Sequence, residues 1–433
     1  MAVWGRCWWG AIIVMSLAWV EPAASIPVFA RIYDKPCSAC HTVYPQLNPA
    51  GEYFRAKGLH GMEPKIEPIH IGAGLEVPGT LPLAVALAAG EDISRAHIPG
   101  VPDSTEEHFN LEFLALLAGG ELGPHLAFLA DYAPLFSIPQ TGDLETNHNL
   151  GMGFLQAHAE PWGWLMNLKA GLIELPLGTS PRVHRLSTQS YLVYGTTASS
   201  FLGKPRRADT LVLSQTQMAV EVSGLQPASG RSFALGISNG TNNLANGKEE
   251  KDVYVRLGQG WGLHRAGFFA YYSPNFLRRG PNDWGLRLGP DANLYWRQAG
   301  LRAQFLASYD AHPTGNDADL WSYGTFVEGE YRWTSSIVTL ARVEYAAIPT
   351  FDDRDEGGTT RVRRRLWQAT AGAQWLPFEN LKLIAEVSYG DNHEGVSDRS
   401  TDSWFFTIRA ATAFWPLTPP GLDVLMRRGE DGT

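Results

Sequence analysis

Apolar and polar residues alternate one by one along much of the chain after residue 80. In the segment 301–310 every odd-numbered residue is apolar, and most even-numbered residues are polar. The segment 381–389 repeats this pattern, with Ile384 as its one exception. Strict alternation over about ten residues predicts β-strands that have one apolar and one polar face.

The spacing of these segments predicts a closed barrel. We predict about sixteen strands, which begin near residues 81, 108, 125, 151, 165, 214, 232, 251, 264, 286, 300, 321, 336, 363, 381 and 403. Connections after even-numbered strands are mostly short, whereas those after odd-numbered strands, such as 177–212 and 349–360, are long. Short periplasmic turns that alternate with long outer loops are typical of an outer-membrane barrel, so we expect the long loops outside the cell.

Aromatic residues stand at both ends of some predicted strands, as in the aromatic girdles of outer-membrane barrels. Trp367 and Trp375 flank Ala369, Ala371 and Ala373 on one predicted face. The separation of eight positions between the two tryptophans spans roughly 20 Å along a tilted strand, which is close to the height of the apolar band of such a barrel. Lipid contact explains small apolar residues outside and polar residues inside, so the sequence predicts a location in the bacterial outer membrane.

One short motif carries the candidate chemistry. Cys37-Ser-Ala-Cys40-His41 has the spacing of a c-type haem attachment site, in which both thiols bond to one haem and the histidine binds iron as proximal ligand. A disulfide needs no adjacent histidine, and no second cysteine pair completes a zinc site. The third cysteine of the chain, Cys7, lies in an N-terminal segment that is expected to be removed. The cofactor predicted is therefore one covalent haem c.

The chain divides into five expected segments. Residues 1–25 read as a signal peptide, with Arg6 before an apolar run and small residues at its end. Residues 26–62 would hold the haem, 63–80 would be a linker, 81–415 the barrel and 416–433 a polar tail. The net charge of −9 argues against a nucleic-acid partner.

A short helix is expected after the haem motif, with Asn48 as its N-cap and Gly58 at its end. Two residues that follow it, His60 and Met62, are the candidates for the distal iron ligand. The sequence leaves open which of them, if either, binds iron.

The segment 26–60 resembles the fused monohaem cytochrome–porins of iron-oxidising bacteria. Pro27-x-Phe-Ala-Arg31 precedes the haem motif, and Leu47-Asn-x-x-Gly-x-x-Phe-Arg55 follows it. The residues 32–35 depart from the Gln-Thr-Gly often found there in that family. The resemblance implies a haem segment in front of a sixteen-stranded barrel. It also implies electron transfer from extracellular Fe(II) to a periplasmic c-type cytochrome.

Two functions remain open at this point. The fold class predicted is a mostly β outer-membrane barrel of about 16 strands with a small N-terminal α-helical monohaem cytochrome c segment as a lumen plug. Such a protein would be an electron carrier, with Fe(II) oxidation as the activity that the resemblance implies. The acidic loop 352–356 would attract that cation. The alternative is a solute porin with a structural or sensing haem, whose anion preference would come from lumen-facing arginines: Arg302, Arg332, Arg342 and Arg409.

Overall fold

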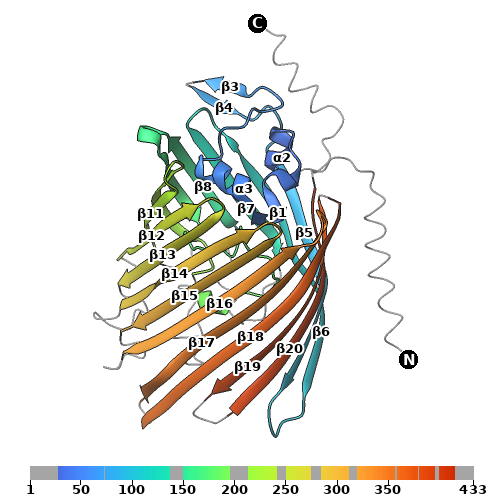
Figure 1. Ribbon diagram of the computed structural model, residues 1–433, viewed down its shortest axis with the longest axis vertical. Coiled ribbons are helices and arrows are strands. Elements are labelled where there is room, and N and C mark those ends of the chain that lie inside the picture. Colours follow the sequence, from blue (N-terminus) through green and yellow to red (C-terminus); the bar gives the residue numbers. More distant parts are fainter. Residues whose placement is uncertain are drawn as a thin grey trace.

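Sixteen antiparallel strands close into a barrel in the computed structural model (Figure 1). The structure describes residues 28–72, 74–136, 150–195, 213–240, 250–274, 284–311, 319–355, 358–378, 380–394 and 399–414. The barrel strands are β5 (Leu83–His97), β6 (Ser104–Glu121), β7 (Leu126–Phe136), β8 (Leu150–Ala159), β9 (Leu165–Ile173), β10 (Gln217–Gln226), β11 (Arg231–Ser238), β12 (Asp252–Trp261), β13 (His264–Pro274), β14 (Trp284–Trp296), β15 (Ala299–Asp310), β16 (Leu320–Arg332), β17 (Ile337–Asp355), β18 (Gly358–Phe378), β19 (Leu381–Glu394) and β20 (Arg399–Phe414). The predicted mostly β, sixteen-stranded barrel is confirmed, and β9, β13 and β19 begin at the predicted residues.

The first and last strands complete the ring. β20 pairs with β5 in a register that runs from Asp402 opposite His97 to Phe414 opposite Val85. Closure leaves no strand edge unpaired, which a lipid-exposed sheet requires because lipid offers no hydrogen bonds.

The wall is apolar outside and polar inside. Trp367 and Trp375 are exposed on the outer face, whereas Arg302 and Arg342 are each 1% exposed and point into the barrel. This arrangement is the reverse of a soluble core and matches a barrel in a bilayer. Within the described residues, no helix is long and apolar enough to cross a membrane.

The N-terminal segment lies at one mouth of the barrel, as Figure 1 shows in blue. Its elements are α2 (Val28–Ile32), η1 (Cys37–Ala39), β1 (His41–Val43), β2 (Gln46–Leu47), α3 (Pro49–Ala56), β3 (Ile69–Gly72) and β4 (Leu75–Val77). The side chain of Asn48 caps α3 by accepting hydrogen bonds from the backbone N–H groups of Ala50 and Gly51. The stretch 63–80, predicted as a linker, contains the hairpin β3–β4.

One long connection folds inward. Residues 174–195, which we call the inward loop, follow β9 and end in α4 (Leu192–Gly195). The prediction that 177–212 lies outside the cell is wrong for 177–195, because Leu177, Tyr191 and Tyr194 are buried inside the barrel. Strand alternation indicates where a loop starts but not the direction in which it folds. The segments 1–25, 196–212 and 416–433 lie outside the described residues. Most of the connection expected at 349–360 is strand, because β17 continues to Asp355 and β18 begins at Gly358, and the side chains of 352–356 lie outside the described residues.

Candidate functional site

The haem motif forms a compact turn that is tied to the next helix. Cys37 begins η1 and Cys40 follows it. Both cysteines are partly exposed, and in the described part of the chain neither forms a disulfide. The Asn48 side-chain amide donates hydrogen bonds to the carbonyls of Ser38 and Ala39, each at 3.1 Å. The same residue therefore caps α3 and fixes the backbone between the two cysteines.

The ring of His41 has the arrangement that an iron ligand needs. Its Nδ1 lies 3.2 Å from the Pro45 carbonyl, so Nδ1 donates and Nε2 keeps its lone pair. Burial lowers the pKa of His41, and this outweighs the backbone hydrogen bonds of Pro45 and Gln46, which raise it. Ligating histidines are neutral and commonly donate the other ring nitrogen to a carbonyl. The residues present therefore fit a haem held through Cys37, Cys40 and His41.

The two candidate distal ligands lie in different surroundings. Both ring nitrogens of His60 face backbone carbonyls, Nδ1 at 2.7 Å from Gly58 and Nε2 at 3.0 Å from Gly123. Met62 packs against an apolar cluster that includes Phe29 and Phe54. His60 would have to break its contact with one backbone carbonyl before it could bind iron. Met62 would have to leave its apolar contacts. The distal ligand stays a prediction.

Aromatic rings pack between the two N-terminal helices. Phe54 on α3 lies edge-on to Phe29 and Tyr33, with ring centroids 5.4 and 5.7 Å apart. The Tyr33 hydroxyl donates to Glu121 on β6 at 2.6 Å, and burial followed by this contact raises the pKa of Tyr33. The helices are thus packed against each other and anchored to the wall.

The N-terminal segment contacts the wall on several sides. Arg55 forms an ion pair with Glu174 just after β9. Gln46 donates to both oxygens of Glu330 on β16, at 2.9 and 2.7 Å. Glu174 follows β9 and Glu330 lies on β16, and these two strands are far apart around the ring. The segment 28–62 therefore reaches across the lumen, and we call it the plug.

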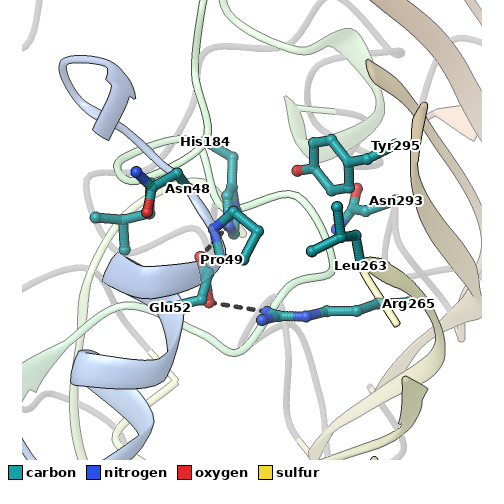
Figure 2. Close-up of a pocket in the computed structure, with 9 residues that line it drawn as sticks. Asn48, Pro49, Glu52, His184, Leu263, Arg265, Asn293 and Tyr295 are labelled. Carbon is teal, nitrogen blue, oxygen red and sulfur yellow. Dashed lines mark hydrogen bonds and ion pairs between the residues drawn. The ribbon is translucent and has the colours of Figure 1, made fainter. Parts of the chain in front are cut away.

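The inward loop holds the plug from a second direction (Figure 2). The Glu52 carboxylate on α3 lies 2.6 Å from Nε2 of His184 and 3.0 Å from Arg265 on β13. Burial by itself would raise the pKa of Glu52, but His184, Arg265 and Arg55 together hold it well below its usual range. Leu47 also donates its backbone N–H to the carbonyl of Val183 at 2.9 Å.

The inward loop, which follows β9, also forms hydrogen bonds with β15 and β19 of the barrel wall. The Tyr194 hydroxyl donates to Gln304 at 2.5 Å, and Thr188 donates to Glu386 through its backbone and its hydroxyl. Sequence reasoning missed this loop. Its apolar residues, which a hydrated outer loop has no reason to carry, were the available signal.

The arginines expected to select anions are mostly neutralised. Arg302 pairs with Glu328 and Glu330, and Arg342 pairs with Glu344. Arg409 pairs with Asp92 at 2.9 Å. Arg332, the last residue of β16, is exposed. Paired cations attract anions weakly, so this set gives little support to an anion-selective lumen.

Comparisons with known proteins identify a fold but no family. No protein-family model and no curated protein matches the chain. Among solved structures, OprB of Pseudomonas putida is 10% identical, with a TM-score of 0.51 over 77% of this chain and 94% of that chain. An anion-selective porin from Comamonas acidovorans is 9% identical (TM-score 0.49, 77% and 99% covered), and OmpT of Vibrio cholerae is 12% identical (TM-score 0.46, 80% and 100% covered).

The closed barrel, its apolar outer face and its polar interior define the class of the protein. It is an outer-membrane β-barrel protein of a bacterium, as the sequence predicts. Its lumen is crossed by a plug and an inward loop. In the described residues, no group of three histidine, cysteine, aspartate or glutamate side chains is arranged to hold a metal ion.

Proposed function

We propose that this protein carries electrons across the outer membrane through one haem held on the plug. The observation that supports this most directly is the position of His41. It lies on a segment bonded to several sides of the wall, with Nδ1 held by the Pro45 carbonyl and Nε2 left for iron. A closed barrel can enclose such a group without exposing polar backbone to lipid.

Some residues of the chain would hold the haem, and others would close the lumen to ions. Cys37 and Cys40 would form the thioether bonds, and His41 would bind the iron. Bound haem would supply a one-electron iron centre. The plug and the inward loop would keep ions from crossing, because their contacts extend from β9 to β16 and β19.

The donor and acceptor come from the resemblance of the segment 26–60. We propose extracellular Fe(II) as the donor and a periplasmic c-type cytochrome as the acceptor. Anaerobic mixing of the purified, oxidised protein with Fe(II) tests the donor, with haem absorbance as the readout. If a different reductant reduces the haem and Fe(II) does not, the protein remains an electron carrier with another donor.

Attachment of haem is tested by the double variant Cys37→Ala/Cys40→Ala. The wild type should give a haem-stained band on a denaturing gel, and the double variant should give none. Cys7→Ala is the matched control and should stain like the wild type. Covalent haem in the double variant would contradict the proposal.

The second candidate function is a solute porin with a structural or sensing haem. It is favoured by the fold, which resembles that of OprB, and by the width of sixteen strands, which in other barrels leaves an aqueous channel. Single-channel recording separates the two. A plugged electron carrier should show little steady conductance, whereas a porin should conduct continuously at neutral pH.

A further inference from the structure

A buried lysine beside the haem motif has no ion-pair partner among the described residues. Lys382 on β19 points into the lumen and is 9% exposed. Its Nζ donates to the backbone carbonyl of Tyr44 at 2.6 Å. Other buried cations of the wall differ, since Arg302 and Arg287 each pair with a carboxylate within 3.0 Å.

The nearby carboxylates are engaged elsewhere. Glu386, on the same face of β19, accepts hydrogen bonds from Ser187 and Thr188 of the inward loop. Glu112 on β6 pairs with Arg409 at 2.8 Å and with Arg185 at 3.4 Å. A buried charge with no counterion is unfavourable, so such a cation points to an anion that completes the site.

The lysine lies next to the predicted iron ligand. Tyr44, whose carbonyl binds Lys382, has its ring centroid 5.5 Å from that of His41. This amine is therefore a candidate partner for a carboxylate of a cofactor that is attached at Cys37 and Cys40 and bound by His41.

We propose that Lys382 forms an ion pair with a propionate carboxylate of the haem. This inference rests on the proposed haem attachment and adds a contact between the barrel wall and the cofactor. Lys382 is then a positioning residue that also balances charge. Plug, haem and wall would be linked through one amine, which would orient the haem relative to β19.

The reduction potential is the measurement that separates this role from a purely structural one. Oxidised haem carries one more positive charge than reduced haem. Removal of a neighbouring cation therefore favours the oxidised form and lowers the midpoint potential. We expect Lys382→Met and Lys382→Gln to keep covalent haem and to shift the midpoint potential downward. Lys382→Arg keeps the charge and should stay near the wild-type value.

Lys169→Met is the matched control, because Lys169 is also a lumen lysine but pairs with Glu221 at 3.3 Å. It should leave the potential unchanged. Heat-modified gel mobility first shows that each variant is a folded barrel. Equal potentials in the wild type and either folded neutral variant would overturn the proposal, although covalent haem would still support attachment.

A small free anion is the other group that would balance Lys382. Replacement of chloride by gluconate distinguishes this case. If the exchange shifts the wild-type potential and not that of Lys382→Met, a diffusible anion occupies the site and the propionate pair is wrong. If the exchange has no effect while Lys382→Met lowers the potential, the counterion is part of the bound cofactor.

Discussion

The Glu52 carboxylate of the plug lies 2.6 Å from Nε2 of His184 in the inward loop. The other ring nitrogen of His184 accepts a hydrogen bond from the backbone N–H of Ser180 at 2.9 Å. Nδ1 is therefore the acceptor, and Nε2 carries the proton that is donated to Glu52. Two segments about 130 positions apart in the chain are joined here, and Arg265 adds a contact from the wall.

Removal of this contact should loosen the plug. Glu52→Ala leaves the ring of His184 and the guanidinium of Arg265 without their shared carboxylate. Because the Arg265 side chain is 41% exposed, solvent screens its ion pair with Glu52, and the loss of these contacts costs on the order of 1–2 kcal/mol. We expect a lower unfolding temperature and brief channel openings in single-channel recordings.

Glu160→Ala is the control for this change, because Glu160 also contacts a plug residue, Lys57, but at 3.5 Å and with half of its side chain exposed. It should behave like the wild type. Identical recordings from Glu52→Ala and the wild type would show that the plug does not depend on this contact.

The same contact should depend on pH. The pKa of Glu52 is depressed in the folded protein, so its stabilising effect is fully present above the unfolded pKa near 4.5. That effect is lost as the pH falls from there toward the lower folded value. Thermal unfolding followed from pH 7 to pH 3 should show a steeper loss of stability in the wild type than in Glu52→Gln. Parallel curves would assign the acid sensitivity to other groups.

The barrel could be predicted from the sequence because lipid imposes a local rule. Each outward position must be apolar and each inward position can be polar, so the alternation in β15 and β19 could be recognised from the sequence. Asn48 was equally readable, because a cap depends on neighbours two and three residues away.

The inward loop and the contact of Glu52 with His184 could not be predicted in this way. Tyr194 bonds to Gln304, and Glu52 to His184, across more than one hundred residues of chain. Contacts of this kind depend on where a closed ring places its strands. The local sequence pattern does not indicate where these strands lie in the ring. The segment 177–212 was therefore expected to lie outside the cell.

Protection from protease should report the direction of the inward loop. A broad-specificity protease applied to intact cells should leave the segment 177–195 uncut, because Leu177, Tyr191 and Tyr194 are buried inside the barrel. It should cut the turn between β5 and β6, where Val101 is 53% exposed. Mass spectrometry of the released peptides identifies the sites. Early cleavage within 177–195 would restore the outside position expected from the sequence.

Asn48 has two functions that one pair of variants separates. Its carbonyl oxygen accepts from the backbone N–H groups of Ala50 and Gly51, and its amide donates to the carbonyls of Ser38 and Ala39. Asn48→Ala removes both sets of bonds, and the cap alone is worth about 1 kcal/mol of stability. Asn48→Asp keeps the cap but places a carboxylate against the two carbonyls of the haem motif.

We therefore expect Asn48→Ala to lower both the unfolding temperature and the yield of covalent haem per barrel. Asn48→Asp should keep most of the helix stability, because aspartate is as good an N-cap as asparagine. It should still lower the haem yield, since the turn between Cys37 and Cys40 loses its two donors. Haem-stained intensity relative to total folded barrel measures this yield. A normal haem yield in Asn48→Asp would show that the turn forms without the amide and that Asn48 acts only as a helix cap.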